Sequence, residues 1–191
     1  MYRMRGTPVE KQLNPTLWRT CRVLSGHTRL LLFRHIVQTP GLNVSQLAVR
    51  VGIGISDASQ ELRRLQSRGL LRRTCHKTSV RYLPIADPQV PSAAPLLKAL
   101  QEVLAGDPAQ LDIIAGMAKG LGSERRVALV RALRQGPQTE DQLALRIGCS
   151  TGNLKKNLAR LKNGGWIQKD GRRIELRPTV HPVGQALIKV L

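Results

Sequence analysis

The side chains with the clearest chemistry lie on one face of a helix expected between residues 55 and 68. Aliphatic residues recur there at helical spacing and define an inward face. On and beside the opposite face lie Ser56, Ser59, Gln60, Arg63 and Arg64. Arginine pairs with guanine, glutamine with adenine, and serine with several base edges in the major groove of DNA. We therefore expect this helix to contact DNA; the alternative is an ordinary solvated helix face.

A second helix of this kind is expected to begin after Ser150, with Leu154, Leu158 and Leu161 facing inward. The residues expected to touch DNA from its outer side are Thr151, Asn153, Lys155, Lys156 and Arg160. Ammonium groups bind phosphate as point charges, so phosphate contact is the expected role of the lysines. The first helix is less suited to phosphate, because it also carries Asp57 and Glu61.

Each of these helices is followed by an expected β-hairpin that carries basic residues. The first hairpin offers Arg72, Arg73, Lys77 and Arg81, and the second offers Lys169, Arg172 and Arg173. Such side chains are expected to meet phosphates, which position a protein on the duplex without reading its bases. Charges that protect a strand edge are the alternative.

Other chemistry finds little support in the sequence. Cys21, Cys75 and Cys149 lie far apart without a CxxC pair, and the histidines add no ligand spacing typical of a metal site. We expect no disulfide framework, no metal and no cofactor, and a reducing compartment fits. No nucleophile with a nearby base, no HExxH motif and no phosphate-binding loop occurs, so an enzyme is not expected.

The elements that would position the basic residues occur twice. Residues 24–36 align with 121–133 at a spacing of 97, and residues 46–69 align with 142–165 at a spacing of 96. The first copy predicts a helix over 28–37, a short helix capped by Asn43 and ending at Gly52, a third helix to about residue 68, and strands over 70–75 and 79–83. The second copy predicts a capping box from Thr139 to Gln142, a cap at Ser150, and strands over 166–169 and 172–176.

The predicted fold class is mainly α with small β-hairpins (α+β), as two tandem winged helix-turn-helix domains. In such domains the third helix enters the major groove and the hairpin meets the backbone. The expected boundaries are 1–87 for the first domain, 88–107 for a linker and connecting helix, and 108–191 for the second domain. Four prolines favour an extended linker over 84–95, and apolar helices are expected over 96–104 and 111–121. Residues 186–191 correspond to the start of the first of these helices.

The charge balance indicates an acidic partner. The 191 residues include 31 Lys and Arg against 12 Asp and Glu, which gives a net charge of +19. Of the 31 basic residues, 22 are Arg. The charge is +11 over residues 1–87 and +8 over 106–191, so both copies are basic. Double-stranded DNA is the expected partner. No apolar run suits a membrane span, and no apolar segment typical of a secretory signal follows Arg3 and Arg5, so we expect no membrane association and a cytoplasmic location.

The first copy resembles the arsenical-repressor (ArsR-type) bacterial transcription regulators. The resemblance rests on Leu24-Ser25-Gly26-His27-Thr28-Arg29-Leu30, Gln46-Leu47-Ala48, Gly52, Leu62, Leu65 and Gly69-Leu70-Leu71. Metal-sensing members carry a cysteine pair before the recognition helix, whereas residues 42–46 contain none, and the helix over 96–104 offers only Glu102 where others bind zinc. Family members usually pair as homodimers of one module. A tandem chain could form an intramolecular pseudo-dimer, and a homodimer stays open.

The predicted function is that of a sequence-specific DNA-binding transcription regulator, with repression by occlusion as the expected mode. A replication initiator or chromosome-organising DNA-binding protein is one alternative. A protein-interaction scaffold that uses winged helices is another, although its surfaces need no charge of +19.

Overall fold

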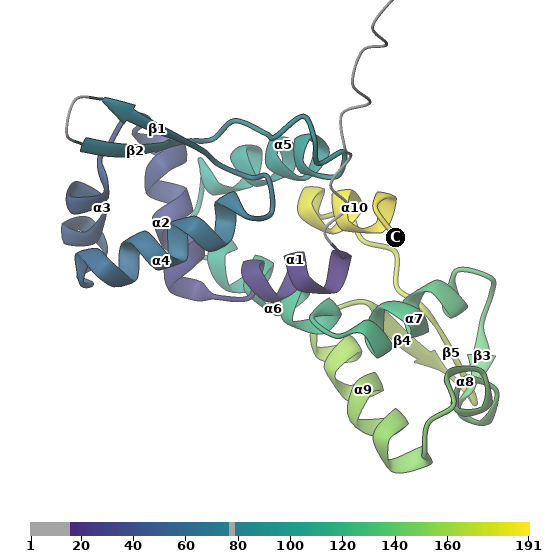
Figure 1. The fold of residues 1–191 in the computed structure, drawn as a ribbon. Coiled ribbons are helices and arrows are strands. Elements are labelled where there is room, and N and C mark those ends of the chain that lie inside the picture. The colour runs from purple at the N-terminus through teal and green to yellow at the C-terminus, as the bar shows by residue number, and fades with distance from the viewer. Residues whose placement is uncertain (1–15, 77–78) are drawn as a thin grey trace, which may run out of the picture.

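The computed structural model describes residues 16–76 and 79–191, and within them the chain is α+β, as predicted (Figure 1). Ten helices and two small antiparallel sheets lie in these ranges. The helices are α1 (Leu17–Leu24), α2 (His27–Gln38), α3 (Val44–Val51), α4 (Ile55–Gln66), α5 (Ala93–Leu104), α6 (Gln110–Leu121), α7 (Glu124–Leu133), α8 (Glu140–Ile147), α9 (Thr151–Asn163) and α10 (Pro182–Lys189). The strands are β1 (Arg72–His76), β2 (Ser79–Leu83), β3 (Gln138–Thr139), β4 (Ile167–Asp170) and β5 (Arg173–Leu176). None of these helices is both long and apolar enough to cross a membrane.

In the first copy of the repeat, local sequence signals account for where helices begin and end. The Gln46 backbone N–H donates to Asn43 Oδ1 at 2.8 Å, and the Asn43 N–H donates to Gln46 Oε1 at 2.9 Å, a capping box that starts α3. Gly52 ends α3 in the left-handed region at φ +70°. The predicted inward residues of α4, Ala58, Leu62 and Leu65, are all buried. The cap at Asn43 and the orientation of α4 are thereby confirmed.

The second copy repeats the order of the first with one extra strand. Thr139 and Gln142 form the predicted capping box at the start of α8. Ser150 occupies the predicted cap position of α9, but its side chain accepts no hydrogen bond from the helix. The sheet has three strands in the order β3-β5-β4, where two were expected, because Gln138 pairs with Ile174 on the far side of β5. In the first copy the corresponding contact is only an isolated bridge between Asn43 and Arg81.

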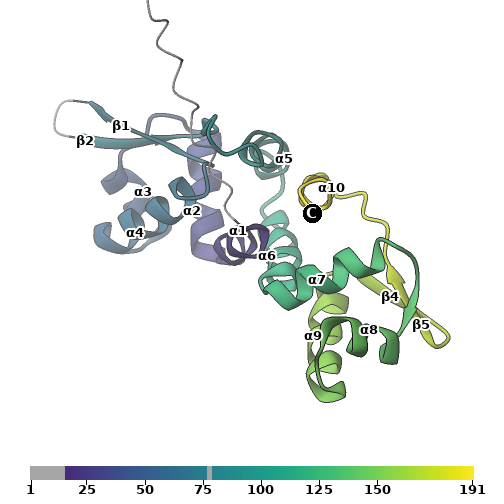
Figure 2. The same cartoon turned by 45° about the vertical axis from the view of Figure 1, so that its right-hand side comes forward.

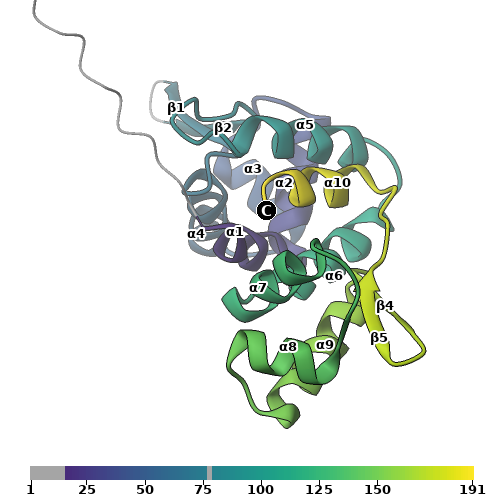
Figure 3. The same ribbon diagram turned by 90° about the vertical axis from the view of Figure 1, so that its right-hand side faces the viewer.

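The two copies are joined through pairs of corresponding helices. Helix α1 packs on α6, and α5 packs on α10 (Figures 2 and 3). The spacing of 97 makes α6 the counterpart of α1, and the order of elements makes α10 the counterpart of α5, because each is the first helix after the hairpin of its copy. The apolar helices expected over 96–104 and 111–121 are α5 and α6, and both take part in joining the copies, although they touch each other only lightly. Helix α1, which the sequence did not predict, is the partner of α6 in this junction.

A single cluster of buried side chains runs through both copies and the junction. Its largest fully buried members include Phe33 and Tyr82 in the first copy and Trp166 in the second. Trp166 Nε1 donates to the Met117 carbonyl oxygen at 2.8 Å, so its one polar atom is satisfied. The division into residues 1–87, 88–107 and 108–191 stays a prediction, since the core does not stop at either boundary.

Candidate nucleic-acid interface

The outer face of α4 and the first hairpin together enclose a hollow of about 300 Å³. Three of the predicted contact residues line it: Ser59 and Arg63 from α4 and Arg73 from β1. Asn43, at the start of α3, and Tyr82, on β2, complete part of its wall. Helix and hairpin therefore present their basic groups to one shared space, which is what simultaneous contact with one DNA backbone needs.

The remaining predicted residues of the first copy are placed differently. Ser56 and Gln60 are exposed on α4 without lining this hollow, and Arg72 is exposed on β1. Arg81 is half-buried, and its Nε has no hydrogen-bond partner among the described residues. Lys77 lies outside the described residues.

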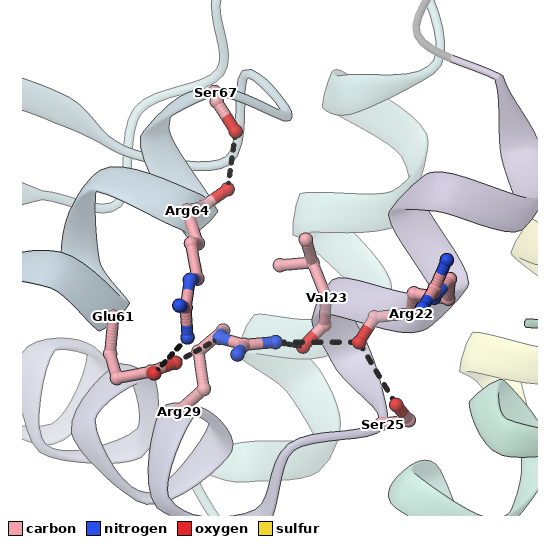
Figure 4. Close-up of polar contacts among 7 residues, drawn as sticks. All are labelled: Arg22, Val23, Ser25, Arg29, Glu61, Arg64 and Ser67. Atoms are coloured by element: carbon pink, nitrogen blue, oxygen red, sulfur yellow. Dashed lines mark hydrogen bonds and ion pairs between the residues drawn. The ribbon is translucent and has the colours of Figure 1, made fainter.

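Arg64 belongs to a network that the sequence did not reveal (Figure 4). Its guanidinium donates to Glu61, and Glu61 also accepts from Arg29 at the start of α2. Arg29 in turn donates to the Val23 carbonyl oxygen near the end of α1. The Glu61 side chain is 19% exposed, and the two arginines offset its charge. Glu61 thus links α4 to α2 and, through Arg29, to the end of α1. Its negative charge is therefore paired within the protein.

The second copy contains the same device with one change. Arg126 corresponds to Arg29, is buried, and donates through Nε to the Gly120 carbonyl oxygen at 2.6 Å and through Nη2 to that of Lys119 at 3.1 Å. Its Nη1 lies 3.5 Å from Oδ1 of Asn157, the counterpart of Glu61 on α9. Burial lowers the pKa of the Arg126 guanidinium, and the nearby charge of Arg160 lowers it further.

Arg29 and Arg126 position the third helices of the two copies, and the sequence analysis missed them. The alignment of the two copies placed Arg29 opposite Arg126, and that coincidence was the available signal. Their partners are backbone carbonyl groups and side chains of distant elements, which no local pattern indicates. Each arginine links the end of one junction helix, α1 or α6, to the third helix of its own copy.

Helix α9 carries the stronger positive charge. Within its bounds it holds four basic residues and no acid, whereas α4 holds two basic and two acidic residues. Lys155, Lys156 and Arg160 are exposed, as are Thr151 and Asn153. The exposed faces predicted for this helix are confirmed as exposed, and their charge suits a polyanion.

All three predicted residues of the second hairpin are exposed. Arg172 and Arg173 are exposed, beside Gly171 at φ +55°. Lys169 Nζ lies 3.2 Å from Oε1 of Glu140 at the start of α8, so this lysine also links the hairpin to α8. In the ribbon views, α4 and α9 lie at opposite ends of the molecule with α1 and α6 between them (Figures 1 and 2).

Comparisons with known proteins give no further guide, since neither a protein-family model nor a curated protein sequence matches this chain. Across the described ranges, no three histidine, cysteine, aspartate or glutamate side chains gather closely enough to hold a metal ion. Cys21 is buried, Cys75 is exposed and Cys149 is half-buried, all as free thiols.

Proposed function

We propose that this protein is a sequence-specific DNA-binding transcription regulator that uses two winged helix-turn-helix modules in one chain. The observation that carries the proposal is the repeated order of helix, capped short helix, glycine turn, third helix and hairpin, with basic side chains exposed on the third helix and hairpin of both copies. In winged helix proteins these two elements meet the major groove and the DNA backbone. The resemblance of the first copy to ArsR-type regulators supports the same function.

The two copies divide the work of recognition in this proposal. On α4, Gln60 and Arg63 are exposed and have the side-chain chemistry to read adenine and guanine. On α9, Lys155 and Lys156 supply charge for phosphates. The net charge of +19 raises affinity for any duplex, so specificity depends mainly on α4 and its hairpin. Repression then follows from occupying a site that the transcription machinery needs.

The test compares two charge-matched double variants. Lys155→Ala/Lys156→Ala removes two charges from the exposed face of α9, and Lys98→Ala/Lys189→Ala removes two exposed charges from α5 and α10. Binding of a labelled duplex is measured by fluorescence anisotropy over a range of salt concentrations. The α9 variant is expected to lower the slope of log K against log salt by about one per lost phosphate contact, and the control is expected to lower it much less. Equal slopes in both variants would place α9 off the DNA.

Specificity is tested by selection from random duplexes. A regulator should enrich one short sequence, and exchange of Gln60 or Arg63 for alanine should relax the preference at one or two base pairs at a cost of about 1–3 kcal/mol each. Binding without any enriched sequence would favour a chromosome-organising role over regulation.

A further inference from the structure

Another hollow, of about 440 Å³, lies between α6, the C-terminal end of α9 and the segment 177–181 that leads into α10. We call it the α6–α9 pocket. Its wall includes Ile113, Gly116 and Met117 of α6 together with Arg177 and Val180. None of the proposed DNA contacts lines it. Its volume is in the range of sites that hold small molecules.

Gly116 keeps this pocket open at no benefit to the fold. It lies in the middle of α6, where glycine destabilises a helix relative to alanine. A Cβ atom at this position would meet no atom within 4 Å, so no close packing requires the glycine. Gly164 differs, because its Cβ would lie 2.9 Å from Trp166 Cδ1 and 3.0 Å from the Cα of Gly120. Gly164 is needed for the close approach of α9 to α6, whereas Gly116 only leaves space.

The first copy of the repeat serves as an internal comparison. At the positions of Gly116 and Gly164 it carries Arg19 and Arg68. Arg68 is half-buried, and burial together with the nearby charge of Arg19 lowers the pKa of its guanidinium. The first copy therefore has two long basic side chains at positions where the second copy has only hydrogen atoms. The pocket is a departure from the repeat and not a consequence of the fold.

The polar groups of the pocket indicate the charge of its ligand. Arg177 is exposed, and its guanidinium forms no hydrogen bond or ion pair with the rest of the described chain. Asp112 also lines the pocket, but its carboxylate already accepts a hydrogen bond from His27 Nδ1 at 3.0 Å. His181 Nε2 donates to Gln110 Oε1 at 3.0 Å, which leaves its buried Nδ1 as an acceptor without a partner among these residues. Arg177 is thus the cation of this wall without a partner among the described residues, beside apolar side chains, whereas the negative charge of Asp112, whose side chain is 82% exposed, contacts His27.

We propose that the α6–α9 pocket binds a small organic anion with an apolar body. Arg177 would pair with the carboxylate, and Ile113, Met117 and Val180 would contact the apolar part. Ile113 and Val180 are 45% and 91% exposed, so the ligand would also cover apolar surface that now faces water. Because the pocket borders α6, α9 and the lead into α10, the ligand would contact the junction and the third helix of the second copy together.

The probe for this proposal is 2-naphthoate, titrated into the full chain without DNA. Binding is followed by calorimetry and by the amide NMR signals of Gly116 and Gly165 and the indole signal of Trp166. We expect saturable binding with shifts at all three sites, and at least about tenfold weaker binding for the neutral 2-naphthalenemethanol, because a charge-assisted hydrogen bond is lost. Absence of binding, or equal binding of the neutral compound, would overturn the proposal.

Two variants and a control locate the site. Gly116→Leu places a side chain in the pocket and is expected to abolish binding, and Arg177→Gln is expected to weaken it at least about tenfold. Arg134→Gln removes the same charge from the exposed C-terminal end of α7, away from the pocket and from the proposed DNA contacts, and should leave affinity unchanged. Retained binding in Gly116→Leu, with its fold verified by circular dichroism, would place the ligand elsewhere. No step of this test uses DNA, so its outcome is separate from that of the proposed function.

Discussion

Glu61 illustrates how one acidic side chain serves a basic helix. From the sequence it counts against phosphate contact, but in the structure it accepts from Arg29 and Arg64 and joins α4 to the α1–α2 corner. Helical spacing predicts which side of α4 is exposed, because that depends on residues close in sequence. It does not predict this network, because Arg29 lies 32 residues away along the chain.

Replacing Glu61 with glutamine should destabilise the fold. The Arg29 and Glu61 side chains are 11% and 19% exposed, so removal of the carboxylate leaves a largely buried guanidinium without its counter-charge. We expect a loss of about 1–3 kcal/mol in the free energy of unfolding, measured by urea titration. The matched change is Asn157→Asp, which gives Arg126 a carboxylate at the corresponding position and should raise the urea midpoint. Equal midpoints for wild type and Glu61→Gln would contradict this role of the ion pair.

The cysteines should differ sharply in reactivity. Burial raises the pKa of the Cys21 thiol to about 12, so at pH 8 only about one molecule in ten thousand carries a thiolate there. Cys75 is exposed on β1. Iodoacetamide at pH 8 should therefore label Cys75 long before Cys21, as read by peptide mass spectrometry. In 8 M urea the difference should vanish, and a native Cys21 that reacts as fast as Cys75 would show that α1 is not packed as described.

At the scale of elements, the starts of helices were predicted correctly where residues close in sequence form the cap. The capping boxes at Asn43 and Thr139 follow from residues three apart, and both are present. Strand β3 was missed because two residues are too few to show the alternation of apolar and polar residues that marks a strand. Its pairing also depends on β5, which lies more than thirty residues later. The last helix begins at Pro182, four residues before the predicted start, since proline suits the first turn of a helix.

Substitutions at the corresponding glycines Gly69 and Gly165 distinguish the cost of backbone strain from the cost of a packing clash. Gly69 and Gly165 lie in the turns that follow α4 and α9, with φ of +73° and +74°, so alanine at either position costs a similar amount of about 1 kcal/mol. A Cβ at Gly69 would lie 2.9 Å from Val90 Cβ in the linker, whereas one at Gly165 would meet nothing within 4 Å. Gly69→Ala should therefore lower the free energy of unfolding by at least about 1 kcal/mol more than Gly165→Ala. Equal losses in urea titration would mean that the linker does not pack on Gly69.

At the scale of the molecule, each helix of the junction packs on the corresponding helix of the other copy. Helix α1 packs on its counterpart α6, and α5 packs on its counterpart α10, as corresponding helices do across an isologous interface. The sequence contained the repeat that makes this possible but not the pairing itself, because each pair joins helices far apart along the chain. The symmetry is approximate, since the pocket beside Gly116 occurs where the first copy has Arg19 and Arg68.

This approximate symmetry has a consequence for the proposed DNA site. The outward positions of α4 and α9 pair as Ser56 with Gly152, Ser59 with Lys155, Gln60 with Lys156 and Arg63 with Ala159, and no pair is identical. Bases are read by particular side chains, whereas phosphates accept any cation. One chain is therefore expected to bind a non-palindromic site whose two parts lie about one helical turn apart.

Selection followed by footprinting at a known ratio of chain to DNA distinguishes this arrangement from its main rival. A single chain should protect both parts, and the part read by α4 should be the more sharply defined, because α4 carries Gln60 and Arg63 where α9 carries Lys156 and Ala159. If two chains pair instead, each using one copy, identical surfaces would meet the two halves and the selected sequence would be a palindrome. A palindrome protected only at two chains per duplex would exclude the intramolecular pseudo-dimer and would leave DNA binding by each copy intact.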